Sequence, residues 1–513
     1  MTIASRCARL LVVVLRIFVS CLPALLVVGI LHFRYGTNIY EHVPVWNDEV
    51  GYWHQAATFA AVGFRGGYYS YNENVARATW TRFDVHGPWY PMLYGTLGLL
   101  LGGWELHTPI IINLLLYTLS IAVFIHTVTP SSVQLLVLAL VLATMHPIIL
   151  YLPTGMSEGM QAAFAMLLAA IFWRLLRQRE QVKPWQLVAY GAFLWIVTVT
   201  RLSWGVLLLP FFLLVFPFNV RGVGLALLMT ALSAGTAYAV VDWVTPGQSI
   251  HSVFHTLSAF TISFDEGLHA LTHRLGVNWE RYISPNKRPV DVLLTQQFWT
   301  VGGILLLSLA SAIVSFIRKT SKATRIFHLL FNLYNLLLVL LSSLFLYIMG
   351  RFGDYRVIGI HLLVTLALLA TFRHYLAPLA FVLMTFMGLA AVGTDADTHR
   401  FYGTSRFTAL SSVKAIDIPK EVIFYDPNAK SPWCNTLLME IPLYTVHATR
   451  IPSGIGLSWV YSLNDINTIQ SQYVWLTDES IEQRQAEALG FKLSPLFDMP
   501  MGMIYLNEAS ACL

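Results

Sequence analysis

The hydrophobic residues of this chain gather in long runs that short polar segments separate. A membrane-spanning helix needs about 20 mostly apolar residues, and eleven stretches of the sequence approach that length. They cover residues 12–31, 109–128, 132–151, 158–173, 186–200, 203–218, 223–243, 298–317, 327–349, 357–372 and 376–393. This pattern predicts an all-α polytopic membrane protein with about eleven transmembrane helices.

The composition supports the same class. Of the 513 residues, 56% are hydrophobic and 12% are charged, whereas an average soluble domain is about 45 to 50% apolar and about 25% charged. A soluble globule and a disordered chain are therefore excluded. The net charge of +5 predicts no nucleic-acid partner, because basic residues of membrane proteins concentrate in cytoplasmic loops.

Lysine and arginine concentrate in two short loops, residues 174–183 and 318–325. When the spans are counted alternately, further arginines fall on the same side: Arg6, Arg9, Arg16, Arg221 and Arg373. The positive-inside rule then predicts a cytoplasmic N-terminus and an outward C-terminus. Since the chain has no Asn-X-Ser/Thr sequon, we expect the bacterial plasma membrane rather than an endoplasmic-reticulum membrane.

Three larger pieces face outward in this topology: residues 32–108, residues 244–297 and the tail 394–513. We expect residues 1–393 to form the transmembrane module and 394–513 a small extracytoplasmic α/β domain, with strands at 421–426, 471–477, 491–497 and 501–506 and a helix from Ser480. Cys434 and Cys512 both lie in this tail. An oxidising compartment could join them, but sequence spacing leaves the bridge open.

Two adjacent acids, Asp48 and Glu49, begin an apolar-periodic segment shortly after the first span. Carboxylates in a first helical turn can simply complement the helix dipole. At a membrane interface, partial desolvation would instead suit Asp48 to act as a general base toward a hydroxyl group. Neighbouring helical residues point about 100° apart, so only one of the two acids can face a site.

The rest of the first outer loop is rich in aromatic and polar residues. Aromatic rings at an interface often form only a membrane belt, yet rings also stack on sugar faces, and here they crowd together with charged groups. The candidate substrate-loop residues are Tyr71, Arg82, His86, Trp89 and Tyr90.

Polar residues at the outer ends of spans are functional candidates, because charge in lipid is costly. Glu158 begins the fourth span and could merely be an acid at a helix N-terminus. Arg201, Arg351 and Arg356 lie on the outer side, against the positive-inside trend. Snorkelling explains any one of them, but three guanidinium groups at one membrane depth favour a phosphate site.

Several common chemistries lack their motifs. The sequence has no P-loop, no HExxH, no G-x-S-x-G and no GxGxxG opening a helix. Nucleotide chemistry is therefore not expected, and the residues leave the metal and any other cofactor unknown.

The joint order of these features resembles the C-type glycosyltransferase (GT-C) superfamily of integral membrane enzymes. The resemblance rests on the Asp48-Glu49 pair after span one, Glu158 above span four, the Thr200-Arg201 turn, the Gly350-Arg351 motif and an outward tail. The superfamily includes the protein O-mannosyltransferases and the aminoarabinose and galacturonic acid transferases of lipid A. The match covers residues 1 to about 393.

The resemblance implies an inverting glycosyltransferase that moves a sugar from a polyprenyl-phosphate donor to a lipid, glycan or protein acceptor on the outer face. It implies Asp48 as the base, Glu49 beside it, and Glu158 as an acid that orients the acceptor or helps to hold a divalent cation in members that use one. It also implies that Arg351 or Arg356, with Arg201 as a further candidate, binds the donor phosphate. The lipid A transferases carry Lys-Pro-Pro where this chain has His86-Gly87-Pro88, a departure that counts against lipid A as acceptor.

Two other functions use similar residues. A transporter or flippase of lipid-linked saccharides would place its charges near the bilayer midplane. A polymerase or ligase of such saccharides also uses outward arginines. Both stay alternatives at this stage.

Overall fold

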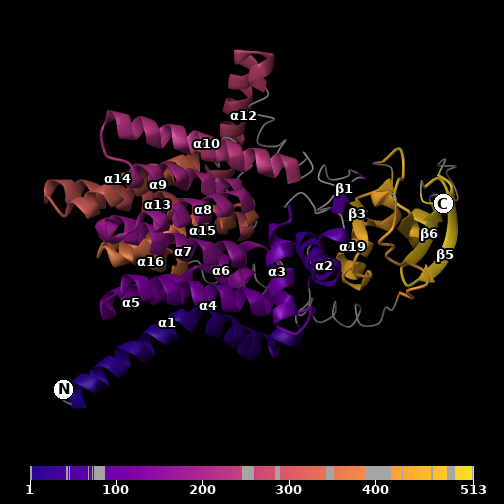
Figure 1. Cartoon of the computed structure of the whole chain (residues 1–513), viewed down its shortest axis with the longest axis horizontal. Coiled ribbons are helices and arrows are strands. Elements are labelled where there is room, and N and C mark those ends of the chain that lie inside the picture. Colours follow the sequence, from indigo (N-terminus) through magenta and orange to yellow (C-terminus); the bar gives the residue numbers. More distant parts are fainter. Residues whose placement is uncertain are drawn as a thin grey trace.

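The structure is a computed structural model that describes residues 3–41, 44, 47–66, 69–71, 73, 87–244, 259–283, 289–341, 352–387, 418–429, 431–463, 466–481, 491–510 and 512. It consists of a mainly helical body and a small sheet domain at one end of it, as Figure 1 shows. The N-terminus lies at the far end of the helical body from the sheet domain (Figure 1). The expected combination of a helical module and an α/β tail is therefore confirmed.

Within the described residues, each of the eleven predicted apolar stretches overlaps helical structure, and residues 342–349 and 388–393 of two of them lie outside the described residues. The helices of the body are α1 (Ile3–Tyr35), α3 (Trp89–Leu100), α4 (Thr108–Val128), α5 (Ser132–Thr144), α6 (His146–Tyr151), α7 (Glu158–Arg177), α8 (Pro184–Thr200), α9 (Leu208–Val215), α10 (Val220–Val244), α12 (Phe264–Ile283), α13 (Pro289–Ile317), α14 (Lys322–Leu341), α15 (Phe352–Thr371) and α16 (Leu376–Met387). Short 3-10 turns cover η1 (Ile39–Glu41), η3 (Arg179–Gln181) and η4 (Leu202–Leu207). In the described ranges, five helices are long and apolar enough to cross a membrane, namely the Leu10–Tyr35 part of α1, α4, α7, α10 and α14.

Two predicted spans are divided rather than continuous. The stretch 132–151 breaks at Met145 into α5 and α6, because Pro147 has no N–H and its ring would clash with the preceding helical turn. The stretch 203–218 begins as the 3-10 turn η4 and continues as α9. The start of α5 is well defined, since Ser131 and Gln134 form a reciprocal capping box.

The helical body packs around α7, which contacts α4 along its length and also contacts α15. Helix α1 packs on α4 and α5, α10 packs on α8 and α9, and α13 packs on α14 and α16. The centre of this body is apolar, with fully buried rings such as Phe124, Phe172 and Tyr117. Helix α12 projects away from the other helices (Figure 1).

The sheet domain contains six strands in the order β1-β3-β2-β4-β6-β5. Their bounds are β1 (Tyr69–Tyr71), β2 (Thr436–Glu440), β3 (Gly456–Val460), β4 (Tyr473–Thr477), β5 (Leu493–Met499) and β6 (Gly502–Asn507), and the short helix α19 (Ile441–His447) follows β2 with the turns η6 (Pro432–Asn435) and η7 (Ala448–Arg450) nearby. The first four strands in this order are parallel, and β6 and β5 are antiparallel to their neighbours. The predicted strands near 471–477, 491–497 and 501–506 are confirmed, whereas residues 420–423 form turns and bends and 424–426 no regular element. The helix expected from Ser480 is described only to Ile481.

The sheet domain includes part of the first loop, so its boundary differs from the expected cut at residue 394. Strand β1 pairs in parallel with β3, with Tyr69 opposite Leu457. Glu73 secures this junction: its carboxylate accepts hydrogen bonds from the backbone N–H groups of Gln470 and Ser471 at 2.8 Å and from the Ser471 hydroxyl at 2.8 Å. Burial raises the pKa of Glu73, while these donors act in the opposite direction.

Helix α2 (Asn47–Val62), which the turn η2 (Gly63–Arg65) follows, joins the two parts of the molecule. Val50 is fully buried in the core of the sheet domain, whereas Tyr52 and Ala56 belong to the core of the helical body. On the sheet side, Nε2 of His54 lies 2.7 Å from the carbonyl oxygen of Ile455. Since α2 buries side chains in both cores, it holds the sheet domain against the helical body.

We expect acid to weaken this junction through His54. Burial lowers the pKa of His54 to about 4 from 6.5, so the stabilisation is complete above pH 6.5 and is lost as the pH falls toward 4, by up to about 3 kcal/mol. Thermal unfolding of the wild type and of His54→Gln between pH 7.5 and 4.5 measures the effect. The variant should lose less stability on acidification, and His126→Gln, which changes an exposed histidine, should behave like the wild type. Parallel pH profiles for the wild type and His54→Gln would contradict the prediction.

The tail cysteines are joined. Cys434 and Cys512 form a disulfide with a Cα–Cα distance of 5.2 Å, and this bridge ties the segment before β2 to the C-terminal end. Sequence spacing left that pairing open.

Candidate functional site

The candidate site lies where α2 meets the loop of residues 152–157. Asp48 and Glu49 occupy the first turn of α2 and diverge as expected for adjacent helical residues. Glu49 is 1% exposed, and its Oε1 accepts a hydrogen bond of 2.7 Å from the backbone N–H of Gly155. Asp48 is exposed. Glu49, and not Asp48, is thus the acid of the pair that faces the buried cluster, which corrects the expectation that Asp48 would meet the outer arginines there.

The absence of a side chain at Gly155 permits this contact. A Cβ atom built on Gly155 would lie 3.1 Å from Cγ of Glu49, which is tighter than ordinary van der Waals contact. Gly159 allows a similar approach one turn later, since a Cβ there would lie 2.3 Å from the Asn113 side chain. These two glycines let the loop and the start of α7 lie against α2 and α4.

Hydrogen bonds from two other helices hold the same loop. The hydroxyl of Tyr90 donates to the carbonyl oxygen of Gly155 at 2.7 Å. Asn113 of α4 donates through Nδ2 to the carbonyls of Thr154 at 2.7 Å and Leu152 at 3.2 Å, and its Oδ1 accepts from the Tyr94 hydroxyl. Because these groups are buried and paired, the loop backbone is held on both sides.

The tyrosines of α3 form a compact stack beside the acids. The rings of Tyr90 and Tyr94 are stacked with centroids 3.9 Å apart, and Tyr52 of α2 lies 4.7 Å from Tyr90. Burial raises the pKa of Tyr90 well above its usual value, and the neighbouring Tyr94, Tyr52, Glu49 and Glu158 act in the same direction. Tyr90 therefore keeps its proton and serves as a hydrogen-bond donor next to two carboxylates.

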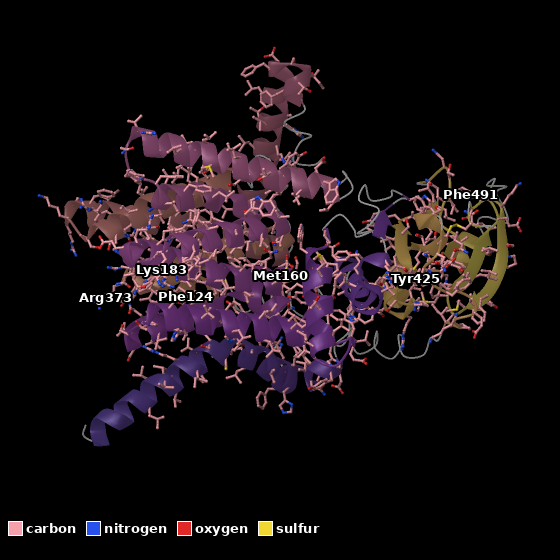
Figure 2. All side chains as sticks on the ribbon, viewed as in Figure 1. Phe124, Met160, Lys183, Arg373, Tyr425 and Phe491 are labelled. Carbon is pink, nitrogen blue, oxygen red and sulfur yellow. A yellow bond between two sulfur atoms is a disulfide. The ribbon has the colours of Figure 1, made fainter. Side chains whose placement is uncertain are left out.

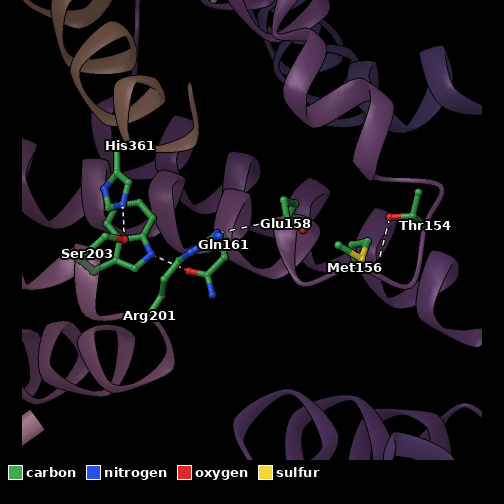
Figure 3. Close-up of polar contacts among 8 residues, drawn as sticks. Thr154, Met156, Glu158, Gln161, Arg201, Ser203 and His361 are labelled. Atoms are coloured by element: carbon green, nitrogen blue, oxygen red, sulfur yellow. Dashed lines mark hydrogen bonds and ion pairs between the residues drawn. The ribbon is translucent and has the colours of Figure 1, made fainter. Parts of the chain in front are cut away.

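Glu158 is the first residue of α7 and pairs with Arg201. The Glu158 carboxylate is 1% exposed and its Oε1 lies 3.6 Å from Nη1 of Arg201, whose side chain is 18% exposed (Figure 3). The N-terminus of α7 also favours a negative charge at this position. Arg201 directly follows α8, where its extended backbone turns the chain into η4. Within the described chain, Glu158 is the acid within ion-pair distance of Arg201, and the remaining guanidinium donors are available to an anion.

Further polar contacts lie beside this pair in the helical body, and Figure 3 shows those of Gln161 and of Ser203 with His361. Nε1 of Trp204 donates to Oε1 of Gln161 at 2.5 Å. The two ring nitrogens of His361 lie 2.9 Å from the Ser203 hydroxyl and 2.8 Å from the Tyr334 hydroxyl. His361 therefore holds η4, and with it the backbone next to Arg201, against α14 and α15.

The other predicted site residues are placed as follows. Trp89 begins α3 and is partly buried. Tyr71 ends β1, where its backbone lies opposite Trp459, and Arg356 lies in α15; the side chains of Tyr71 and Arg356 are not described. Arg82, His86 and Arg351 lie outside the described residues. The structure thus brings together Glu49, Tyr90, Glu158 and Arg201 and leaves Asp48 on the exposed side of α2.

Several residues of the cluster were not predicted from the sequence. Asn113 and His361 are single polar residues within apolar runs, and a polar residue in such a position can indicate a functional site. Tyr94 and Gln161 indicate a site less clearly, because tyrosine and glutamine are common near helix ends. In the described part of the chain, no group of three or more His, Cys, Asp or Glu side chains could hold a metal ion.

Comparison with known proteins adds no relative: no family model, no curated protein and no solved structure matches this chain. The resemblance to the GT-C superfamily therefore stays a prediction that rests on the residues.

Proposed function

We propose that this protein is an integral membrane glycosyltransferase that moves a sugar from a polyprenyl-phosphate donor to an acceptor on the outer side of a bacterial plasma membrane. The observation that carries the proposal is the cluster of Glu49, Tyr90, Glu158 and Arg201 at the end of the helical body that adjoins the sheet domain. The cluster places two carboxylates and one guanidinium group at the same end of the helical body. A lipid-linked phosphosugar requires that combination, since its tail lies in the bilayer and its phosphate at the interface.

The arrangement of the helices supports the proposed topology. Lys183 and Arg373 lie at the end of the helical body opposite the sheet domain (Figure 2), and Arg177 stacks over Phe372 at 4.4 Å. Basic loops that gather at one end favour a cytoplasmic location for that end. We propose that all eleven apolar segments span or enter the bilayer, the shorter ones as tilted or broken helices. The disulfide of the tail agrees with an oxidising compartment outside.

In the proposed reaction, Asp48 acts as the base, a role that rests on the resemblance, because the Asp48 side chain lies outside the cluster that contains Arg201. It is exposed and has no hydrogen-bond partner among the described residues, so an acceptor can reach it. The acceptor hydroxyl loses its proton to Asp48 while its oxygen attacks the anomeric carbon. The bond from that carbon to the donor phosphate breaks with inversion, and the polyprenyl phosphate leaves with the bonding electrons.

The other groups have supporting roles. Arg201 would stabilise the negative charge that develops on the departing phosphate, with Arg351 and Arg356 as further donors. Glu49 fixes α2 on the 152–157 loop and so fixes the direction of Asp48. Glu158 holds the Arg201 guanidinium. The route of the sugar and the acceptor would be lined by Tyr71, Arg82, His86, Trp89 and Tyr90. The acceptor would be a lipid, a glycan or a protein. A divalent cation is a further candidate cofactor.

The decisive experiment incubates the purified full-length protein with a panel of polyprenyl-phosphate sugars and an outer-membrane or envelope glycan acceptor mixture. Loss of one carrier-linked sugar, with release of free polyprenyl phosphate, is the expected result, and mass spectrometry detects both species. If no member of the panel is consumed, with or without added divalent cations, the proposal fails.

One observation favours a second candidate, a transporter of lipid-linked saccharides. The buried polar contacts of His361 with Ser203 and Tyr334 lie in the interior of the helical body, where transporters place polar groups. Protein reconstituted in vesicles with a labelled polyprenyl-phosphate sugar distinguishes the two. A transporter moves the intact lipid between leaflets, whereas a transferase cleaves it.

A further inference from the structure

An apolar groove runs between α13 and α14 in the half of the helical body away from the sheet domain. Its volume is about 630 Å³, which lies within the range of pockets that hold small ligands. The wall from α13 includes Leu309, Ile313 and Phe316, and the wall from α14 includes His328, Leu329 and Leu336. Many of these side chains are half exposed, for example Leu309 at 50% and Ile313 at 54%, so the groove opens on the outer surface of the helices.

Basic residues border one end of this groove. Ile317 lines it, and Arg318 and Lys319 follow directly in the chain; Lys322 and Arg325 then begin α14. The Nε atom of Arg325 is buried without a hydrogen-bond partner among the described residues. This is the same end of the body that carries Lys183 and Arg373 (Figure 2). The groove is therefore mostly apolar and is cationic at its mouth.

We propose that this groove is a binding site for an anionic phospholipid of the surrounding membrane, with one acyl chain between α13 and α14 and the phosphate headgroup on Arg318 and Lys319. Clusters of lysine and arginine next to membrane helices attract anionic headgroups. The proposal requires only that the helical body lies in a bilayer, and it does not depend on the proposed transferase activity.

A polar group lies at the depth expected for the lipid ester linkages. His328 follows Lys322 by six residues, so it lies about 9 Å further along α14. The His328 side chain is buried, and neither ring nitrogen has a hydrogen-bond partner in the described part of the protein. Its ring makes an edge contact with His374, with centroids 4.4 Å apart. Since His328 lines the groove, the ester linkages of a lipid there would lie beside a polar side chain.

The position separates this lipid from the proposed donor. The cluster of Glu158 and Arg201 lies at the end of α7 and α8 nearest the sheet domain, whereas the groove begins at the opposite end, beside the chain segment after α13. A polyprenyl-phosphate donor at the first site and a phospholipid at the second would bind independently.

The test measures lipid binding to the purified full-length protein by native mass spectrometry in mild detergent. Phosphatidylglycerol and phosphatidylcholine with identical acyl chains are added separately. We expect phosphatidylglycerol to bind more tightly, and the paired change Arg318→Gln and Lys319→Gln to weaken it about thirtyfold while leaving phosphatidylcholine unchanged. Lys183→Gln, at the same end but in another loop, is the matched control and should have little effect.

A second variant tests the groove itself. Leu309→Trp fills it with a large ring at a half-exposed position, so it should reduce phosphatidylglycerol binding without lowering the unfolding temperature. Leu227→Trp, on the exposed face of α10, is its control. Equal binding of the two lipids, insensitivity to both groove variants, or occupation by polyprenyl phosphate in preference to phosphatidylglycerol would each overturn the proposal.

Discussion

Replacing Asp48 by asparagine should reduce sugar transfer about 10²- to 10⁴-fold, the range that a general base contributes, and leave the unfolding temperature unchanged. Asparagine has the same shape but cannot take up the acceptor proton. Stability should not change, because the Asp48 side chain is exposed and has no hydrogen-bond partner among the residues that the structure describes. Initial rates of donor consumption and thermal unfolding in detergent provide the two measurements.

Glu49→Gln is the matched comparison. Glu49 is buried and accepts the Gly155 N–H at 2.7 Å, and a hydrogen bond to a charged group contributes about 1.5 to 3 kcal/mol. This variant should therefore lose stability, with a smaller and indirect loss of activity. Near-full activity of Asp48→Asn would remove Asp48 from the role of base. A stable but inactive Glu49→Gln protein would move that role to Glu49.

The second large effect is expected for Arg201→Gln. Removing the guanidinium takes the Arg201 ion pair from the Glu158 carboxylate, which is 1% exposed. Breaking a buried ion pair in this way costs about 3 to 5 kcal/mol, and the partial exposure of Arg201 places the expected loss near the lower end. Donor binding should weaken as well, because a phosphate ligand is lost.

The double variant Arg201→Gln with Glu158→Gln separates these two consequences. Neutralising Glu158 removes the buried charge that Arg201 balances, so most of the stability should return. Affinity for a polyprenyl-phosphate sugar, measured by titration, should stay low. Recovery of donor affinity in the double variant would show that Arg201 acts only through Glu158 and not on the phosphate.

The apolar helices of the body could be read from the sequence, whereas α3 and α12 lie in segments that were expected as outer loops. Apolar runs such as 109–128 and 223–243 coincide with α4 and α10, because hydrocarbon burial requires long apolar stretches whatever the tertiary context. The break at Met145 was missed although Pro147 signalled it. In the tail, extended runs with aromatic and β-branched residues revealed β4, β5 and β6. Strand β2 was missed, since Thr436 is its only β-branched residue and it contains no aromatic residue.

The candidate site could be predicted only in part. Glu49, Tyr90, Glu158 and Arg201 were recognised by residue type and position, and the structure brings them together. Which acid of the Asp48-Glu49 pair faces the cluster could not be predicted, because both lie in the same turn and the choice depends on how α2 rotates against α3 and the 152–157 loop. The roles of Asn113 and His361 could not be predicted, because they depend on hydrogen-bond partners in distant segments of the chain.

By itself, the sequence determined that the protein is largely helical with apolar runs long enough to cross a membrane, that its tail forms an α/β domain, and which charged residues stand at helix ends. These properties depend on local composition and periodicity, which each segment carries alone. Only the tertiary structure decided that β1 joins the C-terminal sheet, that α2 is buried between two cores, and that Glu49 turns inward while Asp48 turns out. Such contacts join residues hundreds of positions apart, and their geometry arises from packing the whole chain.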